Sequence, residues 1–304
     1  MATKIYVTGG TSPTSNQRRK GCMRLRPSIV LLATLAVSAQ ERQVGQGVNF
    51  YSRGKEAALG AQLAQEVRQR TTPLDSVVVR DFLEQIGRKL AAQLPAGISY
   101  TFTAIADDMS GPTHEPLSVP GGYIFVSASL ILTSQNEAEC VGMLAHAMAH
   151  VAARHGTRQL TRAEVVHMAS IPLVFVGGWT GMGAGGNGQA VPISFLSFQR
   201  GYEAEADVLA VKMTSGAGYD PRALVRYIGR MQPEDTAGSK GSSPLPSRDS
   251  RTADMEQAIQ ELPLKTYSSS EEFPRIQSEV RRLTPNQVHR APSLLHPNED
   301  QQKR

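Results

Sequence analysis

Cysteine and tryptophan are scarce in this 304-residue chain, and long apolar runs are missing. It has one tryptophan and two cysteines, Cys22 and Cys140, so a framework of disulfide bonds is excluded. We expect Cys140 to pack in the core, because apolar residues surround it. No run approaches the roughly 18 apolar residues that a membrane-spanning helix needs. Hydrophobic residues make up 40% and charged residues 19%, a composition typical of a globular protein with one large or two modest domains.

Acidic residues are absent from residues 1–39, which hold six of the 32 lysines and arginines. The rest of the chain then has 26 basic and 27 acidic side chains, so the net charge of +5 belongs to the N-terminal segment. A surface that binds nucleic acid needs basic residues clustered on the folded domain. We therefore expect no nucleic-acid partner.

Residues 23–39 have the organisation of a secretory signal peptide. Two arginines precede an apolar stretch at 29–37, and small residues follow up to Ala39. This pattern predicts cleavage after Ala39, an exported protein that is periplasmic or secreted, and no stable membrane span once the signal is removed. Residues 1–22 are then an N-terminal extension of doubtful origin that precedes the signal peptide. The alternative is a buried N-terminal helix, because an apolar stretch of this length fits both structures.

Hydrophobic periodicity and turn residues predict a mostly helical α+β domain with a small sheet. Helices are expected at residues 55–70, 77–94, 134–156, 195–216, 222–231, 253–261 and 274–283, with a further helical stretch from about 161, and strands at 100–105 and 122–126. A glycine-rich segment at 177–188 predicts a flexible loop. We assign residues 50–231 to the main domain, 232–283 to a linker and C-terminal helices of the same domain, and 284–304 to a disordered tail.

Two histidines lie four residues apart in the helix expected at 134–156. His146 and His150 differ by about 40° around the helix axis, so both imidazoles face the same way and can reach one metal ion. The rest of this helix is apolar, and two imidazoles are costly to bury there unless each ring nitrogen has a partner. The alternative is a pair of hydrogen-bonded core histidines.

Glu203 and Asp207 are also four residues apart, on one face of the helix expected at 195–216. A carboxylate from a second helix can complete a site of two histidines and one glutamate. An acid one turn later can accept the free N–H of a ligand histidine and fix its tautomer. Glu205 is expected to face elsewhere. The alternative for Glu203 and Asp207 is that both lie on a solvated acidic helix face, which is the commoner role of two acids spaced in this way.

Three segments, in this order, resemble the M48 family of zinc metallopeptidases: VPGGYIFVSASLI, NEAECVGMLAHAMAHVAARH and FQRGYEAEADVLAVKMTSGAGYDPRALV. The resemblance implies a zincin-like fold of the gluzincin type, one Zn²⁺ per chain, and action on unfolded or misassembled envelope proteins. It also implies a zinc site with a supporting acid, formed by His146, His150, Glu203 and Asp207. The strand edge that binds the substrate backbone would include Gly121, Gly122 and Tyr123.

The chain departs from the family pattern at the catalytic position. Family members read HExxH, in which the glutamate takes a proton from water at the metal, whereas this chain has Ala147. Pro116 removes a backbone N–H donor from the expected substrate edge. Ser243 and Pro244 stand where the family has a His-Pro pair.

These departures leave two hypotheses about function. The first is a zinc-dependent metalloendopeptidase-type protein whose activity is impaired because Ala147 replaces the general-base glutamate. The second is a non-catalytic protein in which zinc stabilises a groove that binds client peptides without cutting them. One base change separates Glu and Ala codons, so an error or an engineered change at codon 147 is a third explanation.

Overall fold

The computed structural model describes residue 45 and residues 47–106, 113–165, 193–234, 246–267 and 271–285, with only the helical backbone described at 193–199. All of them belong to one compact unit, residues 43–304. The expected signal peptide, the glycine-rich segment at 177–188, and Ser243 with Pro244 lie outside the described residues. Among the described helices, none has the length and apolar character needed to cross a bilayer.

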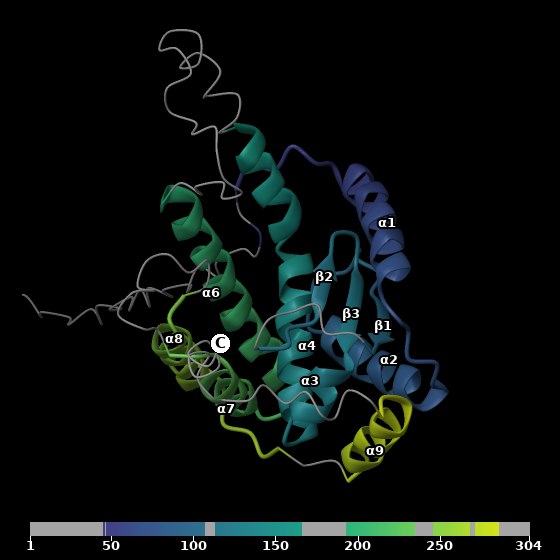
Figure 1. Ribbon diagram of the computed structural model, residues 1–304. Helices are drawn as coiled ribbons and strands as arrows, with labels where there is room; N and C mark the ends of the chain where they lie inside the picture. Colours follow the sequence, from purple (N-terminus) through teal and green to yellow (C-terminus); the bar gives the residue numbers. More distant parts are fainter. Residues whose placement is uncertain are drawn as a thin grey trace, which may run out of the picture. The chain divides into compact units, whose positions relative to one another are not determined.

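The sheet has three strands in the order β1-β3-β2 (Figure 1). Strand β1 (Thr101–Ile105) pairs in parallel with β3 (Tyr123–Ser127), and β2 (Leu117–Val119) pairs with β3 in antiparallel fashion. Strand β3 is therefore the central strand, and its backbone is paired on both sides. The free edge on the side of β2 belongs to a strand that the sequence did not predict.

Two N-terminal helices pack near this sheet. Helix α1 (Arg53–Arg70) begins at Ser52, whose side chain accepts the N–H of Lys55, and α2 (Val77–Ala91) begins at Ser76, whose side chain accepts the N–H of Val79. Helix α2 buries an apolar face in the main core, as its periodicity predicts. These elements confirm the predicted helices at 55–70 and 77–94 and the strand at 100–105, with small differences at their ends.

Helix α4 (Glu137–Ala152) is the buried centre of the domain. The Asn136 side chain accepts the N–H of Glu139, and the Glu139 carboxylate accepts the N–H of Gln135. Two backbone N–H groups at the start of the helix are therefore satisfied by side chains. Helix α3 (Ala128–Thr133), which was not predicted, connects β3 to α4. The predicted end of α4 near Gly156 is wrong. The helix ends at Ala152, Arg154 has a φ of 58°, and a second helical segment occupies residues 155–165.

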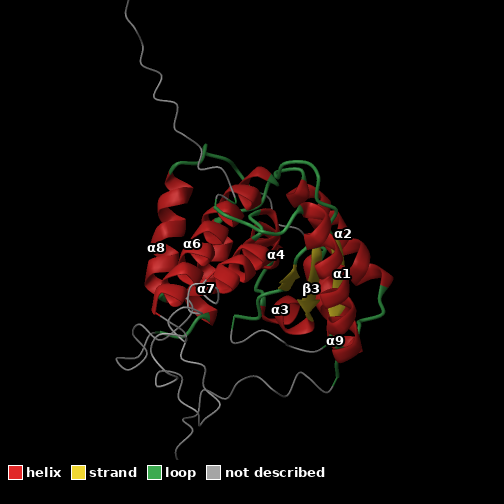
Figure 2. Cartoon of the chain, turned by 90° about the horizontal axis from the view of Figure 1, so that it is seen from above, coloured by secondary structure: helices red, strands yellow, loops and turns green. Residues whose placement is uncertain are grey.

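The C-terminal helices cover the side of α4 that faces away from the sheet. Figure 2 shows α6 (Ile193–Gly216), α7 (Arg222–Met231) and α8 (Arg248–Gln260) on that side, and α4 contacts both α6 and α7. Helix α9 (Phe273–Leu283) packs against α2 and α3. The described part of the chain is thus mostly helical with a small sheet, as predicted, and the sheet contains β2 in addition to the two predicted strands. Helix α4 lies between the sheet and α6, which places side chains from α4 and α6 opposite each other.

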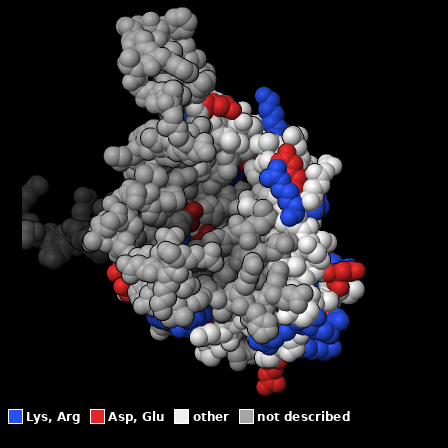
Figure 3. Space-filling view, viewed as in Figure 1, with Lys and Arg blue, Asp and Glu red and all other residues white. Residues whose placement is uncertain are grey.

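Figure 3 shows the charged side chains of the described residues on one face of the molecule. On the face drawn in Figure 3, the lysines and arginines of the described residues form several separate groups with acidic residues among them. This distribution agrees with the near balance of charge after residue 39.

We predict that Gly60→Ala destabilises the domain, because α1 approaches the turn between β2 and β3 at this position. A methyl group on Gly60 would lie 1.7 Å from the carbonyl oxygen of Pro120, so the helix must move away. The expected loss is about 1–3 kcal/mol in the free energy of unfolding, measured by urea denaturation. Gly54→Ala is the matched control, because no atom lies within 4 Å of the added methyl group. Equal stability of the two variants would contradict the close approach of α1 to the turn.

Candidate metal centre

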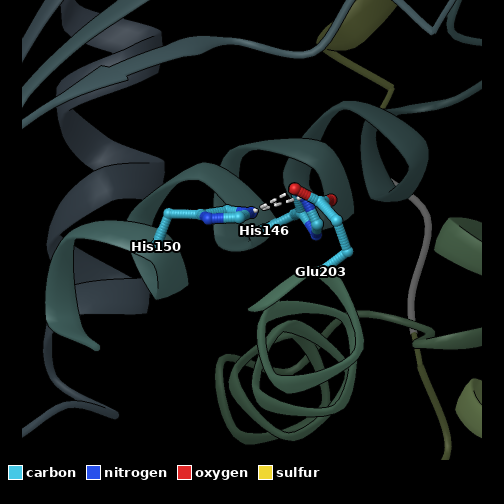
Figure 4. Close-up of side chains that lie close together, drawn as sticks. All are labelled: His146, His150 and Glu203. Carbon is cyan, nitrogen blue, oxygen red and sulfur yellow. Dashed lines mark hydrogen bonds and ion pairs between the residues drawn. The ribbon is translucent and has the colours of Figure 1, made fainter. Parts of the chain in front are cut away.

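Three side chains from two helices converge on one point (Figure 4). The Nε2 atoms of His146 and His150 on α4 lie 3.1 Å apart. Glu203 on α6 places Oε2 3.3 Å from His146 Nε2 and Oε1 3.5 Å from His150 Nε2. One ligand atom from each residue lies within 4.8 Å of the other two. The spacing of four residues thus brings together the three side chains that the sequence predicted as ligands.

The separations fit a divalent metal with tetrahedral coordination. Nitrogen and oxygen ligands about 2.0–2.1 Å from such an ion are about 3.3 Å from each other, close to the three observed separations. Glu203 Oε2 is buried and makes no well-directed hydrogen bond within the described residues. Two imidazole nitrogens and a carboxylate that face one another are a suitable donor set for a cation, which takes the place of the protons shared between them.

Asp207 holds His146 from the opposite side of its ring. Asp207 Oδ1 lies 2.9 Å from His146 Nδ1, so His146 can donate its Nδ1–H and keep Nε2 free for the metal. Both side chains are almost completely buried. Asp207 therefore occupies the supporting position expected from the sequence.

Arg251 on α8 neutralises Asp207, and the sequence analysis missed it. Its Nε lies 2.7 Å from Asp207 Oδ2 and its Nη2 lies 2.8 Å from Asp207 Oδ1, so the pair is bidentate. A third nitrogen, Nη1, donates to Gln232 and lies 3.3 Å from a carboxylate oxygen of Glu115. The guanidinium of Arg251 is buried among three carboxylates, because its Nη2 also lies 3.8 Å from Glu203.

These contacts shift the ionisation of the site. Burial alone would lower the pKa of His146, but the hydrogen bonds to Asp207 and Glu203 raise it to about 10 in the absence of a metal. Burial would raise the pKa of Asp207, and the charge and hydrogen bonds of Arg251 lower it instead. The two neighbouring histidines hold the pKa of Glu203 well below its usual range, against the effect of burial. The acids are therefore ionised at neutral pH, which suits them to bind or support a cation.

A second pair, His155 and Glu205, lies behind His150. His155 Nδ1 is 3.0 Å from His150 Nδ1, and His155 Nε2 is 3.1 Å from Glu205 Oε2. Glu205 is not one of the three converging ligands, and its half-buried carboxylate contacts His155 and Arg158 instead. Burial lowers the pKa of His155 to about 4, so this ring is neutral at physiological pH.

Ala147 follows His146 on α4 and is completely buried. Its methyl group offers no proton acceptor. Apart from Glu203, the carboxylates described around the centre are engaged elsewhere: Asp207 with His146 and Arg251, and Glu115 with Arg251. Glu139, two turns earlier on α4, is bound to Arg230.

A cavity of about 230 Å³ opens beside the converging side chains. It is lined on one side by His150, Glu203 and Tyr202 and on the other by Ser118 and Val119 of β2. Among the described strands, β2 pairs only with β3, so its outer edge has no strand partner.

The position of the free edge differs from the sequence expectation. Gly121 and Gly122 lie in the turn between β2 and β3, both with positive φ, and Tyr123 begins the central strand. Tyr123 is not on the free edge, because it pairs with both Thr101 and Val119, and the two glycines lie outside the strands. Pro116 immediately precedes the strand that does carry the edge.

A convergent site of two histidines and one glutamate on two helices is typical of a metal-dependent hydrolase. The profile of peptidase family M48 matches residues 83–295, which is more than half of the chain, so the protein belongs to peptidase family M48. This membership implies a metal ion, and it supports the sequence resemblance.

The relatives found by sequence comparison are proteases. The chain is 22% identical over 231 residues to the beta-barrel assembly-enhancing protease of Yersinia pestis, covering 72% of this chain and 47% of the relative. The Escherichia coli K12 protein of the same name is 23% identical over 238 residues, with the same coverage. Mitochondrial metalloendopeptidase OMA1 of Schizosaccharomyces pombe is 27% identical over 176 residues, covering 55% of this chain and 51% of the relative. The chain spans about half the length of these relatives.

Proposed function

We propose that this protein is a zinc-binding metallopeptidase of the gluzincin type whose hydrolytic activity is impaired. One Zn²⁺ is held by His146, His150 and Glu203. The observation that supports this most strongly is the convergence of the three side chains where α4 meets α6: the two Nε2 atoms lie 3.1 Å apart, and each lies 3.3 or 3.5 Å from one of the two carboxylate oxygens of Glu203. A bound zinc ion would polarise a peptide carbonyl and make a water molecule more acidic.

The remaining residues of the site orient the ligands but do not move a proton. Asp207 Oδ1 lies 2.9 Å from His146 Nδ1, close enough to hold the proton of this ring on Nδ1 and keep Nε2 free for the metal. The position after His146 carries a methyl group where the family has a carboxylate. Loss of a general base typically costs about 10²–10⁴ in rate, so we propose that zinc binding is retained and that hydrolysis is slow.

A polypeptide in extended conformation fits the free edge of β2. The backbone groups of this edge can pair with an added strand, and such pairing recognises a chain without demanding a particular sequence. The cavity beside His150 and Glu203 borders β2 through Ser118 and Val119, which would carry the added strand past the metal. Pro116 contributes no N–H at the start of this edge, so the pairing is shorter than an unbroken strand would allow.

We propose unfolded or misassembled envelope proteins as the polypeptides that are bound. The names of the bacterial relatives refer to β-barrel assembly, and the N-terminal residues have the pattern of an export signal. Export to the periplasm or the exterior would bring the protein to such polypeptides.

The second candidate function is a non-catalytic peptide-binding protein stabilised by zinc. The observation that favours it is the combination of Ala147 with Pro116, since one removes the proton acceptor and the other weakens the substrate edge. The two candidates share the metal site and differ only in whether a bond is cleaved.

Metal analysis tests the proposed site. The purified protein is expected to contain close to one equivalent of zinc. His150→Ala and Glu203→Gln are expected to lose it, because each removes one of three protein ligands. Glu164→Gln is the matched control, since Glu164 is exposed and its carboxylate accepts a hydrogen bond from the hydroxyl of Tyr51, away from the three proposed ligands. A metal-free protein that is unaffected by these changes would refute the site and restore the interpretation of hydrogen-bonded core histidines.

N-terminal sequencing tests the proposed export. Protein recovered from the periplasm or medium of an export-competent bacterial host is expected to begin at Gln40, because the small residues that end at Ala39 suit signal peptidase. Ala39→Arg is expected to block this cleavage. A folded protein that retains Met1 or Met23 would contradict the proposed signal peptide.

A further inference from the structure

The Nδ1 atoms of the two histidines have different partners among the described residues. Asp207 binds His146 Nδ1, but the Nδ1 of His150 faces another imidazole, that of His155. His155 is 3% exposed and its ring stacks on Tyr202 at a centroid distance of 4.4 Å, so its orientation is fixed by packing. Because His155 is buried, the contact between the two rings needs a donor on one nitrogen and an acceptor on the other.

Glu205, His155 and His150 form a series of hydrogen bonds, and the donor in each bond can be assigned by starting from Glu205. Glu205 is a carboxylate held by the N–H of Gly45 at 2.9 Å and by Arg158 at 3.3 Å, so it can only accept from His155 Nε2. A neutral His155 that donates through Nε2 must accept through Nδ1. His150 must then donate its Nδ1–H to His155, which leaves the lone pair of His150 Nε2 directed at His146 Nε2 and Glu203.

The break after α4 makes this contact possible. In a continuous helix, residues 150 and 155 would be separated by about 140° around the axis and would not face each other. The helix instead ends at Ala152, and Arg154 takes a φ of 58°, a conformation that is costly for a residue with a side chain. Arg154 is held in it by Glu56 at 2.6 Å and by the carbonyl oxygen of Tyr51.

We propose that His155 and Glu205 are positioning residues for His150, which fix its tautomer and ring orientation and thereby set the affinity of the metal site. This inference rests on the metal site proposed above. The two histidine ligands are then supported by acids from the same helix: Asp207 acts directly on His146, and Glu205 acts through His155 on His150. Partners of this kind typically change metal affinity by about 10–100-fold when removed.

Two substitutions at position 155 separate hydrogen bonding from packing. His155→Leu fills space but offers no acceptor to His150, whereas the amide oxygen of His155→Asn can accept the Nδ1–H. The zinc dissociation constant, measured by competition with a chromophoric chelator, is expected to rise about 10–100-fold for His155→Leu and clearly less for His155→Asn. Glu205→Leu is expected to weaken binding in the same direction, and Glu205→Gln less so, because its amide oxygen can still accept from His155 Nε2.

The visible absorption spectrum of the Co²⁺-loaded protein provides a second measurement. His155→Leu is expected to alter the absorption bands that report tetrahedral geometry at the metal. A loss of packing far from the metal would leave these bands unchanged. If the natural chain binds zinc and both leucine variants bind it with unchanged affinity, the positioning role is refuted while the metal site stands. If the natural chain binds no zinc, the site itself is refuted. If His155→Leu does not fold, Glu205→Leu decides the question in the same way.

Discussion

Ala147→Glu is expected to raise endopeptidase activity on unfolded casein by about 10²–10⁴-fold over the natural chain. Residue 147 follows His146 on α4 and lies about 60° from His150 around the helix axis, so a glutamate there would flank the ligands. The ligands and the supporting Asp207 already converge, and a proton acceptor is the missing component. Initial rates of casein cleavage, with and without a chelator, measure the effect.

Ala147→Gln is the matched control for this experiment. It has the same shape as the glutamate variant but cannot take a proton, so it is expected to remain as inactive as the natural chain. It also reports any cost of placing a longer side chain at a completely buried position. Activity of Ala147→Glu is expected to vanish in the chelator and in the double variant with Glu203→Ala.

Cleavage by the natural chain at a rate that the glutamate does not improve would show that another group moves the proton. Glu115, whose carboxylate lies 3.3 Å from Arg251, would then be the first residue to substitute. If neither protein cleaves and both bind zinc, the peptide-binding function is the better account.

Arg251→Leu is expected to lower the free energy of unfolding by about 3–5 kcal/mol, because it leaves the Asp207 carboxylate buried without a cation. Both side chains of this pair are 0% exposed, and the two hydrogen bonds between them are 2.7 and 2.8 Å long. Urea denaturation of the metal-free protein measures the change without a contribution from metal binding.

Arg226→Leu is the control for the arginine substitution. Its partner is Asp220, and the two side chains are 51% and 31% exposed. Removal of such a surface pair is expected to cost about 0–1 kcal/mol. A loss for Arg251→Leu no larger than that of the control would contradict the role of Arg251 in neutralising Asp207.

The convergence of the site was predictable because its residues repeat with the period of a helix. His146 with His150, and Glu203 with Asp207, are each four residues apart, and their faces could be assigned before the structure was known. Arg251 could not be found in this way. It lies 44 residues beyond Asp207 on another helix, and no local pattern relates two residues that meet only by tertiary packing.

The pair of His155 and Glu205 was missed for a different reason. The sequence around Arg154 contains a histidine and then a glycine, which favoured a helix that ended near Gly156. The chain turns two residues earlier instead, through the positive φ of Arg154, and ion pairing with Glu56 from α1 supports that conformation. A turn that depends on a distant partner has no signature in neighbouring residues.

The sheet was predicted only in part. Strands β1 and β3 are five residues long and rich in aromatic and β-branched residues, so their pattern is visible. Strand β2 has three residues, follows a proline, and is too short to show alternation. Its omission caused the predicted substrate edge to be assigned to the central strand.

The central claim is that His146, His150 and Glu203 hold one zinc ion between α4 and α6. A crystal of the zinc-loaded protein, with anomalous diffraction recorded on both sides of the zinc absorption edge, tests it most directly. We predict one zinc-specific peak about 2.0–2.2 Å from His146 Nε2, His150 Nε2 and a carboxylate oxygen of Glu203. The absence of a peak among these three residues, or a zinc peak elsewhere in the domain, would contradict the account.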